Sequence, residues 1–228
     1  MTAPTILFEN PRILIVDKPA GMIVHGSRHD PDTLLECVRS DLTRRGSPPP
    51  FLTPSNRLDR NTRGPVIFAK DPATASALVT LFKQGRIDKT YRARLIGSLP
   101  GPLFIEALIE RGSHRRVRVS IIRTTPEFPE KAAWFNANRT STTISATWIR
   151  PIDYRNEETL AEIDLWTGRH HQIRAVCEAI GHPIFGDRRY NRVKGLKRLK
   201  NSREGFSIHD LTCITLRIPD WGIEVHSG

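Results

Sequence analysis

Asn56-Arg57-Leu58-Asp59-Arg60-Asn61-Thr62-Arg63-Gly64 leads directly into the apolar run Pro65-Val66-Ile67-Phe68-Ala69. A run of this length is typical of a short buried strand, and the prolines of residues 45–55 indicate a loop before it. Asp59 is therefore expected where a loop meets a buried strand, which would fix the residue and still leave it open to a ligand. Because an Asp among arginines is also typical of a surface ion pair, this stretch alone leaves both interpretations open.

The composition indicates a folded globular protein with a polyanionic partner. The chain has 228 residues, of which 38% are hydrophobic and 26% are charged, proportions typical of globular proteins. Lys and Arg number 35 against 24 Asp and Glu, which gives a net charge of +11. This excess predicts binding to nucleic acid or to an anionic membrane surface. The membrane is disfavoured, because no stretch approaches the roughly 18 apolar residues of a spanning helix and no signal peptide is visible.

Cysteine and histidine usage predicts neither a disulfide framework nor a metal site. The three cysteines, Cys37, Cys177 and Cys213, are odd in number and far apart, which fits a reducing cytoplasm. None has a metal-ligand spacing, and we expect all three to be small buried apolar residues. The adjacent pair His170-His171 would not face one another on a helix, so no metal is expected there.

Helix and strand signals predict an α+β fold with a largely antiparallel or mixed sheet. Thr33 and Glu36 have capping-box spacing for a helix over 32–44, and Asp71-Pro72 opens a second helix that Gly85 can end. A third helix is expected after residue 172. Strands are expected at 12–16, 65–69, 89–96, 114–123, 145–150, 159–166 and 211–218, with a loop over 124–143. No linker divides the chain, so a single domain over 1–228 is expected.

Two kinds of arginine-rich segment are candidates for phosphate contacts. In residues 114–123, Arg116 and Arg118 share one strand face opposite valines, which is typical either of a solvated edge or of a track for phosphates. Residues 188–203, which begin with Arg188 and Arg189, hold eight basic residues and no acidic one. Since a solvated face normally includes acidic partners, this segment is interpreted as phosphate-binding.

Arg169 and Arg174 lie near the predicted start of the third helix. Cations at that end oppose the helix dipole and cost up to about 1 kcal/mol. A local conflict of this kind is more expected at a functional site than at a structural one.

Four stretches, taken together, resemble one family. They are Asp17-Lys18-Pro19-Ala20-Gly21, Arg57-Leu58-Asp59 with Thr62 and Gly64, Lys89-Thr90-Tyr91, and the run from Thr167 to Arg174 followed by Gly181-His182-Pro183-Ile184 and Gly186-Asp187. Their order and spacing resemble the RluA-like family of RNA pseudouridine synthases, over roughly residues 6 to 218.

The resemblance implies a pseudouridine-synthase fold, with a long, mostly antiparallel mixed sheet, flanking helices and a central active-site cleft. It implies isomerisation of uridine in ribosomal or transfer RNA, without a metal or organic cofactor. By the same resemblance, Asp59 is the catalytic carboxylate, Tyr91 lies against the base and takes a proton, Arg174 pairs with the aspartate, and Arg57 is associated with the displaced base. The arginines expected to bind substrate are Arg57, Arg63, Arg169, Arg116, Arg118, Arg188 and Arg189.

The sequence also departs from the family pattern. Asn56 stands where the family usually has His, a mild change because Asn also donates and accepts hydrogen bonds. Arg63 stands where Ser is usual, and we expect it to reshape the RNA-facing lip of the cleft.

The whole chain is expected to be one catalytic domain, without a separate N-terminal RNA-binding domain. It is expected to act as a cytoplasmic monomer, since no spare apolar stripe is visible. The alternative is a catalytically weak RNA-binding or RNA-folding module on the same fold. A phosphate-transfer enzyme is disfavoured, because no glycine-rich phosphate loop precedes a helix.

Overall fold

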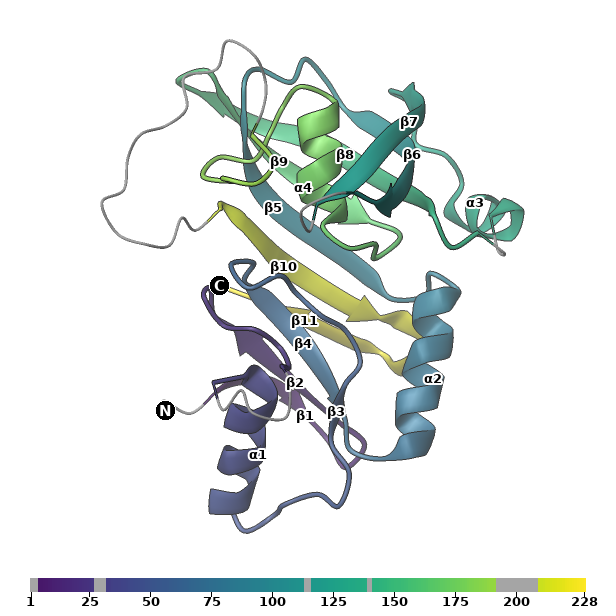
Figure 1. Cartoon of the computed structure of the whole chain (residues 1–228). Helices are drawn as coiled ribbons and strands as arrows, with labels where there is room; N and C mark the ends of the chain where they lie inside the picture. Colours follow the sequence, from purple (N-terminus) through teal and green to yellow (C-terminus); the bar gives the residue numbers. More distant parts are fainter. Residues whose placement is uncertain (1–3, 27–31, 113–115, 139–140, 192–208) are drawn as a thin grey trace. The chain divides into compact units, whose positions relative to one another are not determined.

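The computed structural model describes residues 4–26, 32–112, 116–138, 141–191 and 209–228 (Figure 1). The chain divides into two compact units: the first comprises Met1–Ile87 with Thr212–Gly228, and the second comprises Asp88–Leu211. Four α-helices occur among the described residues. The strand pairs within each unit are antiparallel. The predicted α+β class is therefore confirmed.

The first unit contains a sheet in which the stretch around Asp59 leads into an inner strand. The strand order is β1 (Thr5–Glu9), β2 (Ile13–Lys18), β4 (Gly64–Ala69) and β3 (Thr53–Pro54). Every residue of β4 is buried, as the apolar run predicts. The register of β2 and β4 ends with Lys18 opposite Gly64, so the end of β2 lies beside the loop that carries Asp59. The unit also contains the hairpin of β10 (Leu211–Ile218) and β11 (Ile223–His226).

Both predicted helices of the first unit form, with the predicted caps. Helix α1 (Leu34–Arg44) begins after Thr33, whose side chain accepts the Glu36 N–H at 3.2 Å. Helix α2 (Pro72–Lys83) begins after Asp71, whose carboxylate accepts the Thr74 N–H at 2.7 Å. The core of the unit combines α2 with four strands; its fully buried members include Ile13, Ile15, Ile67, Leu78, Leu216 and Ile218.

The second unit contains an antiparallel sheet with two short helices. Its strand order is β5 (Asp88–Ile96), β9 (Glu158–Leu165), β8 (Ile144–Arg155), β6 (Leu103–Arg111) and β7 (Val117–Thr125). Buried and partly exposed residues alternate along β9, as its sequence predicts. Helix α4 (Gln172–Ala179) packs against β7 and β6 (Figure 1).

The expected loop over 124–143 is wrong, because helix α3 (Lys131–Ala137) forms within it. Its cap is Glu130, whose carboxylate accepts the backbone N–H groups of Ala132 and Ala133. Trp134 fixes the helix by burying its ring and donating its indole N–H to Glu106 at 3.1 Å. The two prolines before the helix concealed it in the sequence, since proline clusters usually mark loops.

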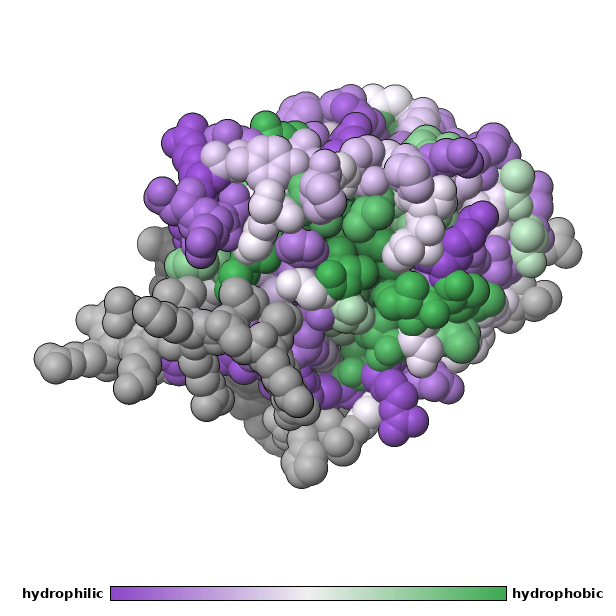
Figure 2. Space-filling view, turned by 90° about the horizontal axis from the view of Figure 1, so that it is seen from above, coloured by the Kyte–Doolittle hydropathy of each residue, from purple (hydrophilic) through white to green (hydrophobic). Residues whose placement is uncertain are grey.

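Helix α3 contributes to an aromatic core that reaches the surface. Trp134, Trp148 and Trp166 pack together with Phe104, and the exposed ring of Phe128 makes edge-on contacts with two of these tryptophans. The space-filling view shows hydrophobic surface bordered by hydrophilic side chains (Figure 2).

Candidate active site

Asp59 lies in a tight turn between β3 and β4. The Thr62 N–H donates to the Asp59 carbonyl at 3.1 Å. Leu58 is buried, Asp59 is half-buried, and Arg57 is exposed. Burial of the leucine anchors the turn, while the carboxylate remains partly open to solvent.

The side chain of Asn56 joins the start of this loop to β4. Its carbonyl oxygen accepts the Ile67 N–H at 2.8 Å, and its amide donates to the Pro65 carbonyl at 3.2 Å. The departure from the family's usual His therefore retains both a donor and an acceptor, as expected.

A buried ammonium supports the same loop. The Lys18 side chain is wholly buried, and its Nζ donates to the carbonyls of Pro19 and Met22, both at 2.8 Å, and of Arg60 at 3.0 Å. These are the three donors that an ammonium offers. One lysine thus joins the turn after β2 to the residue that follows Asp59. The sequence contained Lys18 within a family motif but did not indicate this role.

Burial and neighbouring charges act in opposite directions on Lys18. Burial lowers the pKa of Lys18 to about 8, although the Asp59 carboxylate favours the charged form. Arg60 adds to the lowering. A moderately alkaline solution would therefore remove the positive charge of Lys18 that acts on Asp59.

Two backbone contacts hold the loop from opposite ends. The Gly21 N–H donates to the Arg60 carbonyl at 2.8 Å, and the Cys213 N–H donates to the Arg63 carbonyl at 2.9 Å. Gly64 has φ +127°, and a Cβ at this position would lie 2.5 Å from the Cys213 carbonyl oxygen. Only glycine allows β10 to approach so closely. These main-chain contacts therefore help to fix the loop that carries Asp59.

The arginines of this loop face solvent. Arg57, Arg60 and Arg63 are all exposed, and Arg60 donates to the Gly21 carbonyl at 3.2 Å. Within the described part of the chain, neither Arg57 nor Arg63 has a carboxylate within 4.0 Å. Both guanidinium groups therefore face solvent, and their predicted contacts with substrate stay predictions.

Tyr91 lies on β5 in the second unit. Its side chain is buried, on the same strand face as Ala93 and Leu95, which confirms the alternation read from the sequence. In the register it stands opposite Ile163 of β9. Its contact with a target base stays a prediction.

Arg174 lies in the first turn of α4 and forms a buried ion pair with Asp187. Its Nε and Nη2 donate to the two carboxylate oxygens at 2.6 and 3.0 Å, and the Asp187 side chain is fully buried. Burial would raise the pKa of Asp187, but the hydrogen bond and charge of Arg174 hold it below its usual value. This carboxylate offsets the unfavourable position of a cation at a helix start. Because Asp59 lies in the other unit, its predicted pairing with Arg174 stays a prediction.

Arg169 precedes α4 and is held by main-chain carbonyls. Its guanidinium donates to Ser141 at 3.0 Å and to Ile144 at 3.2 Å. Burial lowers the pKa of Arg169. The contact of Arg169 with substrate stays a prediction, and the bonds observed for its guanidinium connect it to the strand and loop before α4.

Much of the positive charge on the sheet of the second unit is paired. Arg92 lies 3.3 Å from Glu162, and Arg150 lies 3.4 Å from Glu162 and 3.5 Å from Asp164. These pairs connect β5, β9 and β8 across one face. The carboxylates neutralise Arg92 and Arg150. A strand face that binds phosphates would instead need arginines without carboxylate partners.

The remaining predicted arginines differ in exposure. Arg116 is largely buried and pairs with Glu178, whereas Arg118 is exposed and stands opposite Glu110 in the register. Arg188 and Arg189 are exposed. The rest of the basic segment, 192–203, lies outside the described residues. Contacts of these four arginines with RNA stay predictions.

The described residues contain no group of His, Cys, Asp and Glu that could hold a metal ion. All three cysteines are buried, as predicted, and among the described residues none of them forms a disulfide. None of the helices in the described ranges is long and apolar enough to cross a membrane.

Comparison with known proteins defines the family. The model of the RNA pseudouridylate synthase family matches residues 12–179. The chain belongs to this family, and the resemblance read from its sequence is confirmed.

Two relatives show the range of its members. Ribosomal large subunit pseudouridine synthase D of Nitrosomonas europaea is 30% identical over 188 residues, which are 82% of this chain and 49% of that protein. The mitochondrial tRNA pseudouridine(32) synthase of Saccharomyces cerevisiae is 27% identical over 187 residues, 82% of this chain and 37% of that protein. The chain thus spans half or less of the length of these relatives.

A solved structure agrees with the fold. Human RNA pseudouridylate synthase domain containing 1 aligns with a TM-score of 0.70 and 26% identity, over 99% of this chain and 83% of that chain. The predicted pseudouridine-synthase fold is therefore confirmed.

Proposed function

We propose that this chain is an RNA pseudouridine synthase that isomerises uridine in ribosomal or transfer RNA. The observation that carries the proposal is the half-buried Asp59, which lies in a loop held by Lys18 and two backbone contacts. The resemblance read from the sequence expects the catalytic carboxylate at this residue. The relatives are named for both RNA classes, so both remain open for this chain.

The reaction breaks the bond between ribose C1′ and uracil N1 and forms a bond between C1′ and C5. The proton on C5 leaves to solvent, and N1 gains a proton, so that substrate and product contain the same atoms. Asp59 acts on the sugar, as nucleophile or as base, while the first bond breaks. A carboxylate suits this step because it stays ionised at neutral pH.

The other predicted residues assist the base and the RNA backbone. Tyr91 offers a flat ring to the uracil and a hydroxyl for proton transfer. Arg174, already oriented by Asp187, pairs with the Asp59 carboxylate. Removing the target base from its stack costs a few kcal/mol. Phosphate contacts by Arg57 and Arg63 offset this cost.

The proposal includes a cytoplasmic monomer that needs no cofactor. The three buried cysteines, none of which forms a disulfide among the described residues, support a reducing compartment. The chemistry assigned to Asp59, Tyr91 and Arg174 needs only side-chain groups.

Release of tritium tests the activity and identifies the substrate class. Cells that lack this gene are grown with uridine tritiated at C5, and their ribosomal and transfer RNA are purified separately. Each pool is incubated with the wild-type protein. Because bond formation at C5 expels the label, we expect release from one pool. Absence of release from both pools would contradict the proposed activity.

A second candidate function is an RNA-binding or RNA-folding module of low activity. Arg63 favours it, because this residue is exposed, has no carboxylate within 4.0 Å in the described ranges, and stands where the family usually has serine. Tight, salt-sensitive RNA binding without tritium release from either pool would support this alternative.

A further inference from the structure

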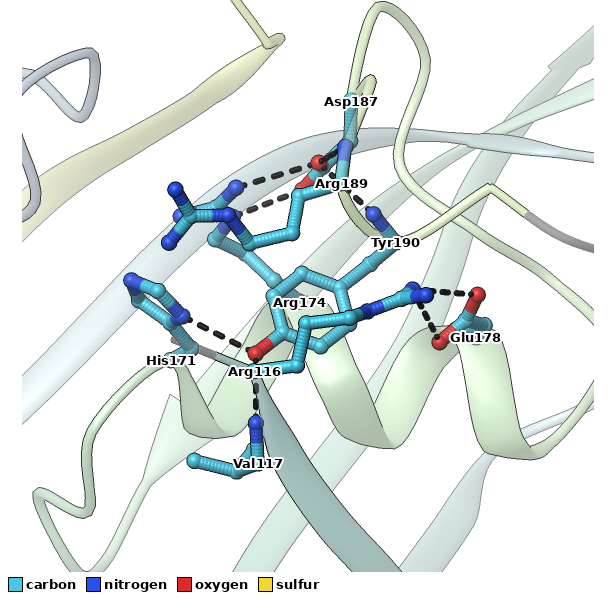
Figure 3. A network of polar contacts seen from close by, with 8 residues as sticks. All are labelled: Arg116, Val117, His171, Arg174, Glu178, Asp187, Arg189 and Tyr190. Atoms are coloured by element: carbon cyan, nitrogen blue, oxygen red, sulfur yellow. Dashed lines mark hydrogen bonds and ion pairs between the residues drawn. The ribbon is translucent and has the colours of Figure 1, made fainter. Parts of the chain in front are cut away.

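Tyr190 is a buried tyrosine to which the proposed reaction assigns no role. It is 1% exposed. Its hydroxyl accepts the Val117 N–H at 3.0 Å and lies 2.9 Å from Nδ1 of His171 (Figure 3). Val117 begins β7, and His171 is the cap residue of α4. One hydroxyl therefore joins the start of a strand to the start of a helix.

Two ion pairs lie beside the Tyr190 ring. The guanidinium carbons of Arg116 and Arg174 are 4.9 and 5.1 Å from the ring centroid. Nη2 of Arg116 donates to both carboxylate oxygens of Glu178, at 3.0 and 3.2 Å (Figure 3). The Tyr190 N–H donates to Asp187, the partner of Arg174. We call Tyr190, Arg116 and Glu178 the Tyr190 clamp.

Strand β7 has little buried surface of its own. No residue of β7 is fully buried, and it is an edge strand bonded only to β6 in the second unit's sheet. Edge strands with little buried surface readily detach at their ends. The clamp acts at Val117, next to the exposed Arg118.

We propose that the Tyr190 clamp is a positioning device that holds the start of β7 on α4 and so presents Arg118 to the RNA backbone. Tyr190 and Arg116 are thus positioning residues that act through β7, so that of the phosphate contacts expected of Arg116 and Arg118 only that of Arg118 is direct. The proposal rests on the proposed function for the identity of the ligand, which is RNA.

Tyr190→Phe isolates the role of the hydroxyl, because the ring beside both guanidinium groups remains. We expect the KM for RNA to rise about three- to tenfold, the range that corresponds to one lost hydrogen bond, with kcat within about twofold. Tyr154→Phe is the matched control, since the Tyr154 hydroxyl also bonds to the main chain, in this case by donating to the Leu99 carbonyl at 2.6 Å. The control is expected to leave KM unchanged. A purely structural tyrosine would lower the melting temperature without changing KM.

Glu178→Gln distinguishes positioning from direct contact by the sign of its effect. If Arg116 bound phosphate itself, weakening its internal pair would leave RNA binding unchanged or improve it. The clamp predicts instead that Glu178→Gln and Arg116→Ala both weaken binding, by about three- to tenfold. Both substitutions should raise KM and leave kcat nearly unchanged.

The RNA dissociation constant of each variant is measured alongside turnover, at a temperature where circular dichroism shows the variant folded. A wild type without turnover would refute the proposed function, while the order of the dissociation constants would still decide the role of the clamp. Unchanged or tighter RNA binding by Glu178→Gln, or by Tyr190→Phe, would overturn the inference.

Discussion

The loop around Asp59 and the region around α4 are both rich in arginine, but they use it in opposite ways. In the loop, backbone hydrogen bonds and the Lys18 ammonium fix the chain, and the arginine side chains are exposed. Around α4, Arg116 and Arg174 are largely buried and carry carboxylate partners. A count of arginines therefore does not distinguish exposed guanidinium groups from those that carboxylates neutralise, whereas their pairing does.

The largest expected effect is loss of the buried pair near α4. Asp187→Asn leaves the Arg174 guanidinium buried beside a neutral partner, which we expect to destabilise the fold by about 3–5 kcal/mol. Chemical denaturation measures this change. Asp153→Asn is the control, because its partner Arg155 is highly exposed and the expected loss is about 0–1 kcal/mol. Equal effects of the two substitutions would show that burial does not distinguish these pairs.

The next effect tests the backbone clamp on the loop. Gly64→Ala combines strain at positive φ, about 1–3 kcal/mol, with a clash against the Cys213 carbonyl. We expect a lower melting temperature and at least a tenfold loss of turnover, about 1.4 kcal/mol in the barrier. Gly222→Ala separates the two causes, since Gly222 also has positive φ but a Cβ there meets nothing within 4 Å. Similar losses in both variants would contradict the role of the close approach.

The lowered pKa of Lys18 predicts that a rise in pH above about 8 lowers activity and raises stability. Above pH of about 8 the amine loses its proton, so it has two donors for three carbonyls and no charge near Asp59, and turnover should fall. Between this pKa and 10.5 the unfolded lysine binds more protons than the folded one, so its contribution to the free energy of unfolding rises with pH.

A pH–rate profile and a melting series check this prediction. Lys18→Arg keeps its charge across this range and should remove the alkaline fall in turnover. Persistence of the same fall in that variant would assign it to another group.

The smallest effect concerns exposed charge. Arg63→Ala removes an unpaired cation, so the dependence of RNA affinity on salt should weaken by about 0.7–0.9 in log–log slope, the value for one phosphate contact. Arg92→Ala removes a cation that Glu162 already neutralises and should leave the slope unchanged. Equal changes in slope would remove the distinction between paired and unpaired arginines. Affinity titrations at several salt concentrations provide the measurement.

Local signals in the sequence predicted much of the fold. Thr33 and Asp71 marked the starts of α1 and α2, because a cap depends on residues three apart in the chain. Helix α3 was missed because a glutamate caps it and a distant contact between Trp134 and Glu106 fixes it. Strands β1, β6 and β11 were not singled out either, and the loop predicted over 45–55 contains the short strand β3 at its end.

The candidate site was predicted as a set of residues but not as an arrangement. The Asp59 motif and the helix conflict at Arg174 were visible as sequence. The solution to that conflict, Asp187, was not, because an ion pair depends on how the chain turns back after α4. The same reason concealed the role of Lys18, whose three acceptors come from two separate turns.

The most direct test of the account is the turnover of Asp59→Asn. Tritium release from the RNA pool that the wild type modifies is measured for this variant and for Asp220→Asn, a control that removes a carboxylate paired with the exposed Arg86. We predict that Asp59→Asn lowers release by about a thousandfold or more, as loss of a nucleophile typically does, while RNA affinity and the control's turnover stay within about twofold. Retention of a tenth of wild-type release by Asp59→Asn would contradict the assignment of Asp59 as the catalytic carboxylate.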